Sequence, residues 1–158
     1  MNTNQHASDT VEAIVTELEF RKGVIPRAQL SMLASQLAVA KATNKNTKEF
    51  AGFELMEAIA VIDVLKEVGT PVPAIDPNSQ AFLSQLESLE GDIFDKAYMQ
   101  AEQDNHEYLR DLAQNYLNGK AENLSAADPE VRRLAKVALY AFTEHVAMSK
   151  RINGELNA

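Results

Sequence analysis

The chain has 158 residues, of which 46% are hydrophobic and 24% are charged, a balance typical of a globular protein with one core. It contains no cysteine, which excludes disulfides, thiolate metal sites, iron–sulfur clusters and thiol nucleophiles. The formal net charge of −8 argues against nucleic acid or an anionic lipid surface as the main partner.

The N-terminal segment comes first, and it is polar throughout. Residues 1–9 lack both the basic and the apolar region of a signal peptide, and we expect residues 1–8 to be disordered. No stretch of the chain approaches the roughly 18 apolar residues of a membrane span. A cytoplasmic protein has this appearance, and so has a secreted protein that is read without its signal.

All regular elements that the sequence predicts are helices, because Ala, Leu, Glu, Gln and Lys dominate and no run alternates as a β-strand does. The first helix is expected to begin near Ser8 or Asp9, with Glu12 as a capping-box partner. Gly23 and Pro26 are expected to interrupt it. The later predicted helices cover about residues 26–43, 46–68, 79–89, 92–117 and 128–152.

Turn signals set the boundaries of these later helices. Asn46 is expected to cap the helix at 46–68, and Gly69 with the prolines that follow is expected to stop it. Asp128, followed by a proline, is a helix start, and Asn153 begins a frayed end. The expected fold is therefore all-α, an antiparallel four-helix bundle with a short extra helix, forming one domain over 9–153 with a frayed C-terminus at 154–158.

Several polar residues fall on the apolar faces of these helices. His145 lies in the middle of the apolar stripe of the last helix, and His106 lies at the edge of the stripe of the helix at 92–117. A buried polar group costs a few kcal/mol unless it is hydrogen-bonded. The favoured interpretation is structural, with His145 as a core histidine hydrogen-bonded to a neighbour such as Asn105 or a tyrosine, and with His106 partly in contact with solvent.

The alternative interpretation is a single-metal site built from His106, His145, Glu57 and Glu102. Glu57 falls inside the apolar stripe of the helix at 46–68, with Glu54 alongside it. Imidazole and carboxylate ligands suit zinc, copper, nickel or iron. A standard di-iron centre is not expected, because no Glu-x-x-His sequence precedes any of the three histidines.

A longer pattern is found around the helix at 92–117. The sequence Phe94-Asp95-Lys96-Ala97-Tyr98, with His106 after it, resembles the signature of the bacterial domain-of-unknown-function family 4142. The segments Leu33-Ala34, Phe50-Ala51 and His145 to Met148 extend the resemblance over about residues 28–152. This resemblance implies a ferritin-like bundle and a periplasmic or outer-membrane location, with cytoplasm as the alternative, and it implies no established reaction.

The chain departs from that family at one position. Family members commonly carry Asp-His in the segment after Phe-Ala, whereas Glu57-Ala58 stands there in this sequence. One of three family histidines is therefore missing, and Glu57 is a candidate to replace it as a ligand.

Three functions follow from these observations, in order of preference. The first is a non-catalytic helical protein of the cell envelope, related to stress or acting on a protein partner, and the two-sided apolar helix at 46–68 leaves a homo-oligomer open. The second is a metal-binding or redox bundle that uses the core histidines and glutamates. The third is a carrier of a small ligand. No catalytic motif, such as a Gly-rich phosphate loop or His-Glu-x-x-His, is present.

Overall fold

The computed structural model describes residues 15–119 and 125–158, which form five helices and no strand. The helices are α1 (Glu17–Lys41), α2 (Lys45–Glu67), α3 (Pro77–Ser88), α4 (Gly91–Asn118) and α5 (Asp128–Leu156). The expected disordered segment 1–8 and the expected helix start at residue 9 lie outside the described residues. Among the described helices, none is long and apolar enough to cross a membrane.

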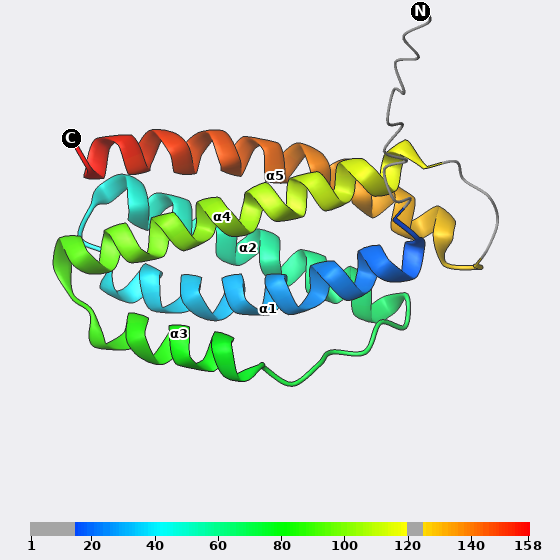
Figure 1. Ribbon diagram of the computed structural model, residues 1–158, viewed down its shortest axis with the longest axis horizontal. Helices are drawn as coiled ribbons and strands as arrows, with labels where there is room; N and C mark the ends of the chain where they lie inside the picture. Colours follow the sequence, from blue (N-terminus) through cyan, green and yellow to red (C-terminus); the bar gives the residue numbers. More distant parts are fainter. Residues whose placement is uncertain (1–14, 120–124) are drawn as a thin grey trace, which may run out of the picture.

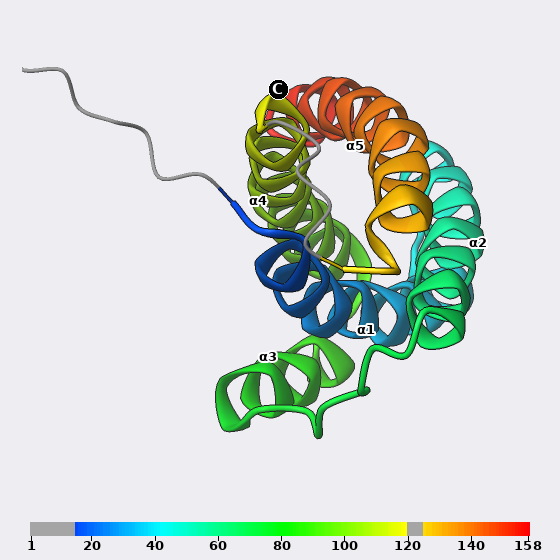
Figure 2. The same ribbon diagram turned by 90° about the vertical axis from the view of Figure 1, so that its right-hand side faces the viewer.

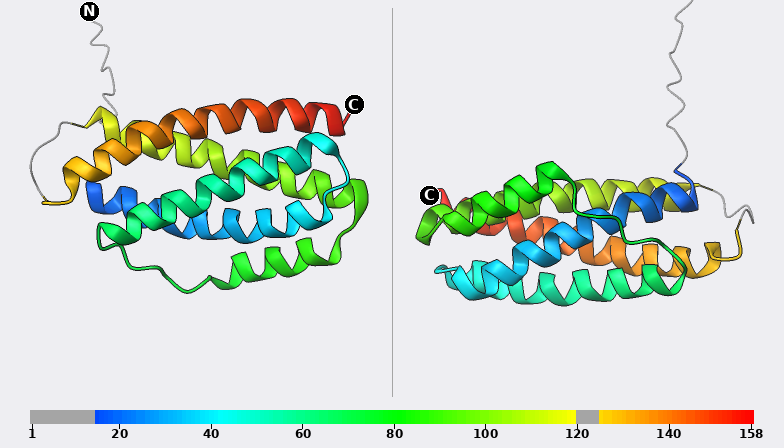
Figure 3. Two further views of the ribbon diagram at one scale, coloured as in Figure 1. Left: turned by 180° about the vertical axis from the view of Figure 1, so that it is seen from behind. Right: turned by 90° about the horizontal axis from the view of Figure 1, so that it is seen from below.

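The four long helices lie side by side along the long axis of the molecule (Figure 1). α1 packs mainly on α2, and α4 packs mainly on α5, each as an antiparallel pair. Viewed end-on, the two pairs surround a common centre, and α3 lies outside them against α1 (Figure 2). The connection between α2 and α3 runs back along the outside, so that α4 has the same direction as α2 (Figure 3).

The predicted break at Gly23 and Pro26 is wrong, because α1 continues through both residues. A Cβ atom at Gly23 would lie 2.6 Å from the side chain of Leu112 on α4, so the glycine serves a close approach of two helices. The flanking Val24 and Ile25 are buried, and this burial outweighs the one backbone hydrogen bond that Pro26 cannot make.

Two other boundaries also differ from the prediction. Asn44, and not Asn46, caps α2 by accepting a hydrogen bond from the backbone N–H of Thr47. The frayed end expected from Asn153 onward is absent, because α5 continues to Leu156. The Asn153 side-chain amide donates to the carbonyl oxygen of Met99, at 3.1 Å, and this bond fixes the last turns of α5 to α4.

The apolar core is divided into two clusters along the long axis. One cluster contains Phe20 and Leu109, and the other contains Phe50 and Phe94. Between them lies a layer of buried polar residues, which come from all four long helices: Ser31 and Ser35, Glu54, Glu102 and His106, and His145 and Ser149. This layer is what the fold places at its centre.

Candidate metal centre

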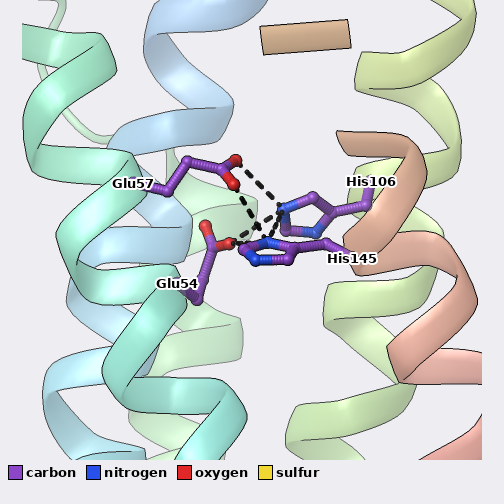
Figure 4. Close-up of side chains that lie close together, drawn as sticks. All are labelled: Glu54, Glu57, His106 and His145. Atoms are coloured by element: carbon purple, nitrogen blue, oxygen red, sulfur yellow. Dashed lines mark hydrogen bonds and ion pairs between the residues drawn. The ribbon is translucent and has the colours of Figure 1, made fainter. Parts of the chain in front are cut away.

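Four side chains from three helices converge in the polar layer (Figure 4). Glu54 and Glu57 stand three residues apart on α2, a spacing that places both on one face of the helix. His106 on α4 and His145 on α5 face them. Each of the four residues offers one ligand atom, and these atoms all lie within 4.8 Å of one another.

The distances between the donor atoms match the size of a metal ion. The Nε2 atom of His106 lies 2.9 Å from a Glu54 oxygen and 3.6 Å from a Glu57 oxygen. The Nδ1 atom of His145 lies 2.8 Å from Glu54 and 3.1 Å from Glu57. Zinc bonds of about 2.0–2.1 Å place tetrahedral ligand atoms about 3.3 Å apart, and the four imidazole–carboxylate distances lie on both sides of that value.

The orientation of the His106 ring is fixed by a hydrogen bond on its side away from the cluster. Its Nδ1 atom lies 2.8 Å from the backbone carbonyl oxygen of Glu102, to which it donates. The Nε2 atom therefore points toward the other three side chains. A histidine that binds a metal usually donates its second ring N–H in this way, which sets the ring's tautomer and angle.

The carboxyl group of Glu102 lies near Nδ1 of His106, on the side of the ring away from the cluster, and is not part of the four-residue group. One of its oxygens is 3.5 Å from Nδ1 of His106 and accepts the hydroxyl hydrogen of Ser31 on α1. Of the four ligands predicted from the sequence, the structure thus brings Glu57, His106 and His145 together and places Glu102 behind His106. Glu54 joins the group in its place.

Burial and the neighbouring charges shift the pKa values of Glu54 and His106 in opposite directions. Burial alone raises the pKa of the Glu54 carboxyl, but the positive charge and hydrogen bond of His106 and the contact with His145 lower it to about 2. Burial alone lowers the pKa of His106, but Glu54 beside it, followed by Glu57 and Glu102, raises it well above the usual value. Without a metal, a proton shared with His106 therefore offsets the buried negative charge.

Glu57 has a different environment from Glu54. Burial raises the pKa of its carboxyl, and the charge of Glu54 adds to this effect against the lowering contacts of the two histidines. Its side chain is 14% exposed, whereas that of Glu54 is 2% exposed. Glu57 is thus the most exposed member of the cluster, followed by His145 with 9% of its side chain exposed.

Aromatic rings enclose the two histidines. The ring centroid of Phe50 lies 5.0 Å from that of His145 and 6.2 Å from that of His106, and Phe142 lies 5.9 Å from His106. These rings keep water away from the imidazoles, so charges in the cluster interact more strongly than they would at the surface.

The structural interpretation of the two histidines is wrong in its details. Asn105 does not contact His145; it exchanges hydrogen bonds with Arg27 on α1. His106 is completely buried, not a residue at a solvated edge. Glu54, the member of the cluster that was absent from the predicted ligands, carried a signal that could have found it, since two glutamates three apart within one apolar stripe point inward together.

One family profile covers nearly the whole chain. The profile of a domain of unknown function, DUF4142, matches residues 2–152. The chain belongs to the DUF4142 family. No curated protein matches this DUF4142 protein.

Two solved structures resemble this DUF4142 protein in fold. A DUF305 fragment from Deinococcus radiodurans is 13% identical, with a TM-score of 0.72 over 88% of this chain and 95% of that one. A DUF305 protein from Streptomyces coelicolor, whose name marks it as a predicted secreted protein, is 12% identical, with a TM-score of 0.71 over 92% and 96%. At such identities the likeness concerns the fold alone.

Two residues of the family signature, Asp95 and Tyr98, stabilise the fold of this DUF4142 protein and do not belong to the four-residue cluster. The buried carboxyl group of Asp95 accepts hydrogen bonds from the backbone N–H and hydroxyl of Thr43 and from the backbone N–H of Asn44. It thereby holds the turn between α1 and α2 against α4. The Tyr98 hydroxyl lies 2.8 Å from the Ser35 hydroxyl, which joins α4 to α1.

Proposed function

We propose that the protein binds one divalent transition-metal ion through Glu54, Glu57, His106 and His145. The observation that carries this proposal is the convergence of four donor atoms, from three helices, within 4.8 Å of one another in a buried layer. Packing alone gives no reason to gather two carboxyl groups and two imidazoles there, since buried charges are costly unless they are paired or bind a metal.

The donor set favours zinc and similar ions. Two carboxylates balance the charge of a divalent ion, and two neutral imidazoles complete four ligands. Calcium and magnesium prefer oxygen ligands only, whereas zinc, iron and their neighbours accept mixed nitrogen and oxygen sets. This cluster of two carboxylates and two histidines supports one ion, since a di-iron centre requires about four carboxylates and two histidines.

The wider setting of the proposal is a ferritin-like four-helix bundle in the cell envelope. One long connection between the second and third long helices, as here between α2 and α4, is typical of ferritin-like bundles. Membership of the DUF4142 family, whose resemblance implies a periplasmic or outer-membrane location, supports this setting. Fractionation of the native cells, with detection of this protein in the periplasmic fraction, tests the location.

Metal analysis tests the proposed function directly. The purified protein is stripped with a chelator, reloaded with Zn²⁺, desalted and analysed for metal by mass spectrometry. We expect about one ion per wild-type chain and a loss of at least tenfold in affinity for Glu54→Gln and His145→Ala. Glu67→Gln is the matched control, because Glu67 is an exposed glutamate on the same helix. Equal metal content in Glu54→Gln and Glu67→Gln would overturn the proposal.

A second candidate function is a protein-interaction module. Phe53 and Met56 on α2 and Val137 and Tyr140 on α5 are all at least half exposed. The two helices pack against each other, and large exposed apolar patches are typical of interaction surfaces. Light scattering tests self-association: we expect Met56→Glu with Val137→Glu to abolish any dimer, and a wild type that is monomeric at high concentration would count against a homo-oligomer.

A further inference from the structure

A groove runs along the seam between α2 and α5. Its volume is about 430 Å³, within the range of small-molecule sites. Its walls are formed by apolar side chains of both helices: Ala60, Val61, Val64, Leu134, Val137, Ala138 and Ala141.

One end of this groove adjoins the candidate metal centre at Glu57. Glu57 lines the groove and also belongs to the four-residue cluster. Val61 follows Glu57 by one turn of α2, and Ala141 precedes His145 by one turn of α5. The groove therefore continues the line of the cluster along the two helices, and Glu57 is its inner end.

The other end of the groove is charged. Glu130 and Arg133 line it there and form an ion pair with each other. Between this pair and Glu57, the lining offers no charged or hydrogen-bonding side chain. The groove thus suits a molecule that is apolar along its length and polar only at the head that reaches Glu57.

Glu57 is the ligand most easily exchanged. Its contact with His106, at 3.6 Å, is the longest between the two carboxylates and the two imidazoles, and its side chain is more exposed than that of His106 or Glu54. Metal sites that act on small molecules keep three protein ligands and leave one position for water or substrate. Glu54, His106 and His145 would be the three that remain.

We propose that the groove binds a medium-chain monocarboxylate, whose carboxylate takes the place of the Glu57 carboxylate on the metal ion and whose chain lies along α2 and α5. In this exchange one metal–oxygen bond to Glu57 breaks and one to the ligand forms, and the incoming carboxylic acid gives its proton to the released Glu57 carboxylate, so that the net charge of the site is unchanged. From residue 57 to residue 64 the groove covers two turns of α2, about 10 Å, which accommodates a chain such as that of octanoate. The inference rests on the proposed metal site.

Cobalt provides the probe, because Co²⁺ occupies zinc sites and its visible absorption reports its ligands. Octanoate added to the Co²⁺-loaded protein is expected to change the bands saturably, whereas acetate needs concentrations at least 100-fold higher. Each methylene added between butanoate and octanoate is expected to tighten binding about three- to fourfold. The metal-free protein is expected to bind octanoate at least tenfold more weakly by calorimetry.

Two variants that fill the groove complete the test. Ala141→Phe and Ala60→Leu, on opposite walls, are expected to weaken octanoate binding at least tenfold with the cobalt bands unchanged. Ala147→Phe, on the exposed face of α5 outside the groove, is the control and is expected to bind octanoate normally. If the protein takes up cobalt but its absorption bands do not change with octanoate, or change equally with acetate, the groove proposal is overturned and the metal site stands. A protein that takes up no cobalt would overturn the metal site and this inference together.

Discussion

The Nε2 atom of His106 on α4 lies 3.3 Å from the Nδ1 atom of His145 on α5. Both nitrogens also lie within 3 Å of the same Glu54 oxygen. Such an arrangement requires a positive charge at its centre, either a proton or a metal ion, because nitrogen lone pairs and a carboxylate otherwise repel one another. A proton and a metal ion therefore compete for the same position.

Zinc is expected to raise the melting temperature of the protein. A ligand at 100 times its Kd stabilises the folded state by about 2.7 kcal/mol, which corresponds to roughly 5–10 °C for a chain of this size. Calorimetry with and without a chelator measures the change. Glu54→Gln should show no increase and Glu67→Gln the full one; an equal response of both variants would show that zinc acts elsewhere.

The metal-free protein is expected to lose stability as the pH rises from about 5 to 8. Burial, with the charge of Glu54, raises the pKa of Glu102 to about 8 from 4.5, so that the folded state keeps a proton that the unfolded chain releases. The raised pKa of His106 acts in the same direction. A folded state that binds more protons loses stability with rising pH, here by roughly 3–4 kcal/mol from Glu102 alone.

Melting temperatures in chelator at pH 5 and pH 8 check this loss. Glu102→Gln, which cannot release a proton, should remove a large part of the slope, and the exposed Glu144→Gln should leave it unchanged. Below about pH 4.5 the sign reverses, because the lowered pKa of Glu54 is a contribution that is lost as the pH falls. A melting temperature that rises steadily to pH 8 would contradict the assignment.

Asp95→Ala is expected to destabilise the fold without removing the metal. The substitution leaves two backbone N–H groups, of Thr43 and Asn44, without the acceptor that holds the turn between α1 and α2. We expect a loss of about 2–3 kcal/mol in denaturant unfolding. Asp63→Ala, at an exposed position of α2, should cost less than about 0.5 kcal/mol. A metal content per folded chain below that of the wild type would instead link Asp95 to the site.

The hydrogen bond between Tyr98 and Ser35 is expected to show coupling in a double-mutant cycle. Tyr98→Phe leaves the buried Ser35 hydroxyl without a partner and should cost about 1 kcal/mol, and Ser35→Ala should cost a similar amount. The double variant should cost clearly less than the sum, because neither orphaned group remains. Additive costs would mean that the two hydroxyls do not depend on each other.

The helical class of the fold could be predicted from the sequence, but several element boundaries could not, and the break expected at Gly23 and Pro26 shows the reason. Composition and periodicity predict helices throughout, and the structure has only helices among its described residues. The continuation of α1 through Gly23 and Pro26 depends on the contact of Gly23 with Leu112, a residue far along the chain. Local signals of helix breaking cannot report such a tertiary contact.

The candidate site, too, could be predicted only in part, because its contacts are tertiary. Helical phase marked His145 as a polar residue on an apolar face, because one helix alone defines that face. Which partners it meets depends on how α2, α4 and α5 are rotated about their axes, and that rotation is set by packing. Asn105 and Glu54 were therefore indistinguishable as partners of His145 before the structure placed Asn105 against Arg27.

The division of the core by the polar layer has a consequence for how the sequence can change over evolution. Side chains in the cluster around Phe20 do not pack against those around Phe94, so a substitution in one cluster needs no compensating change in the other. Each half of the molecule can drift in sequence separately, while the polar layer between them constrains all four long helices at once.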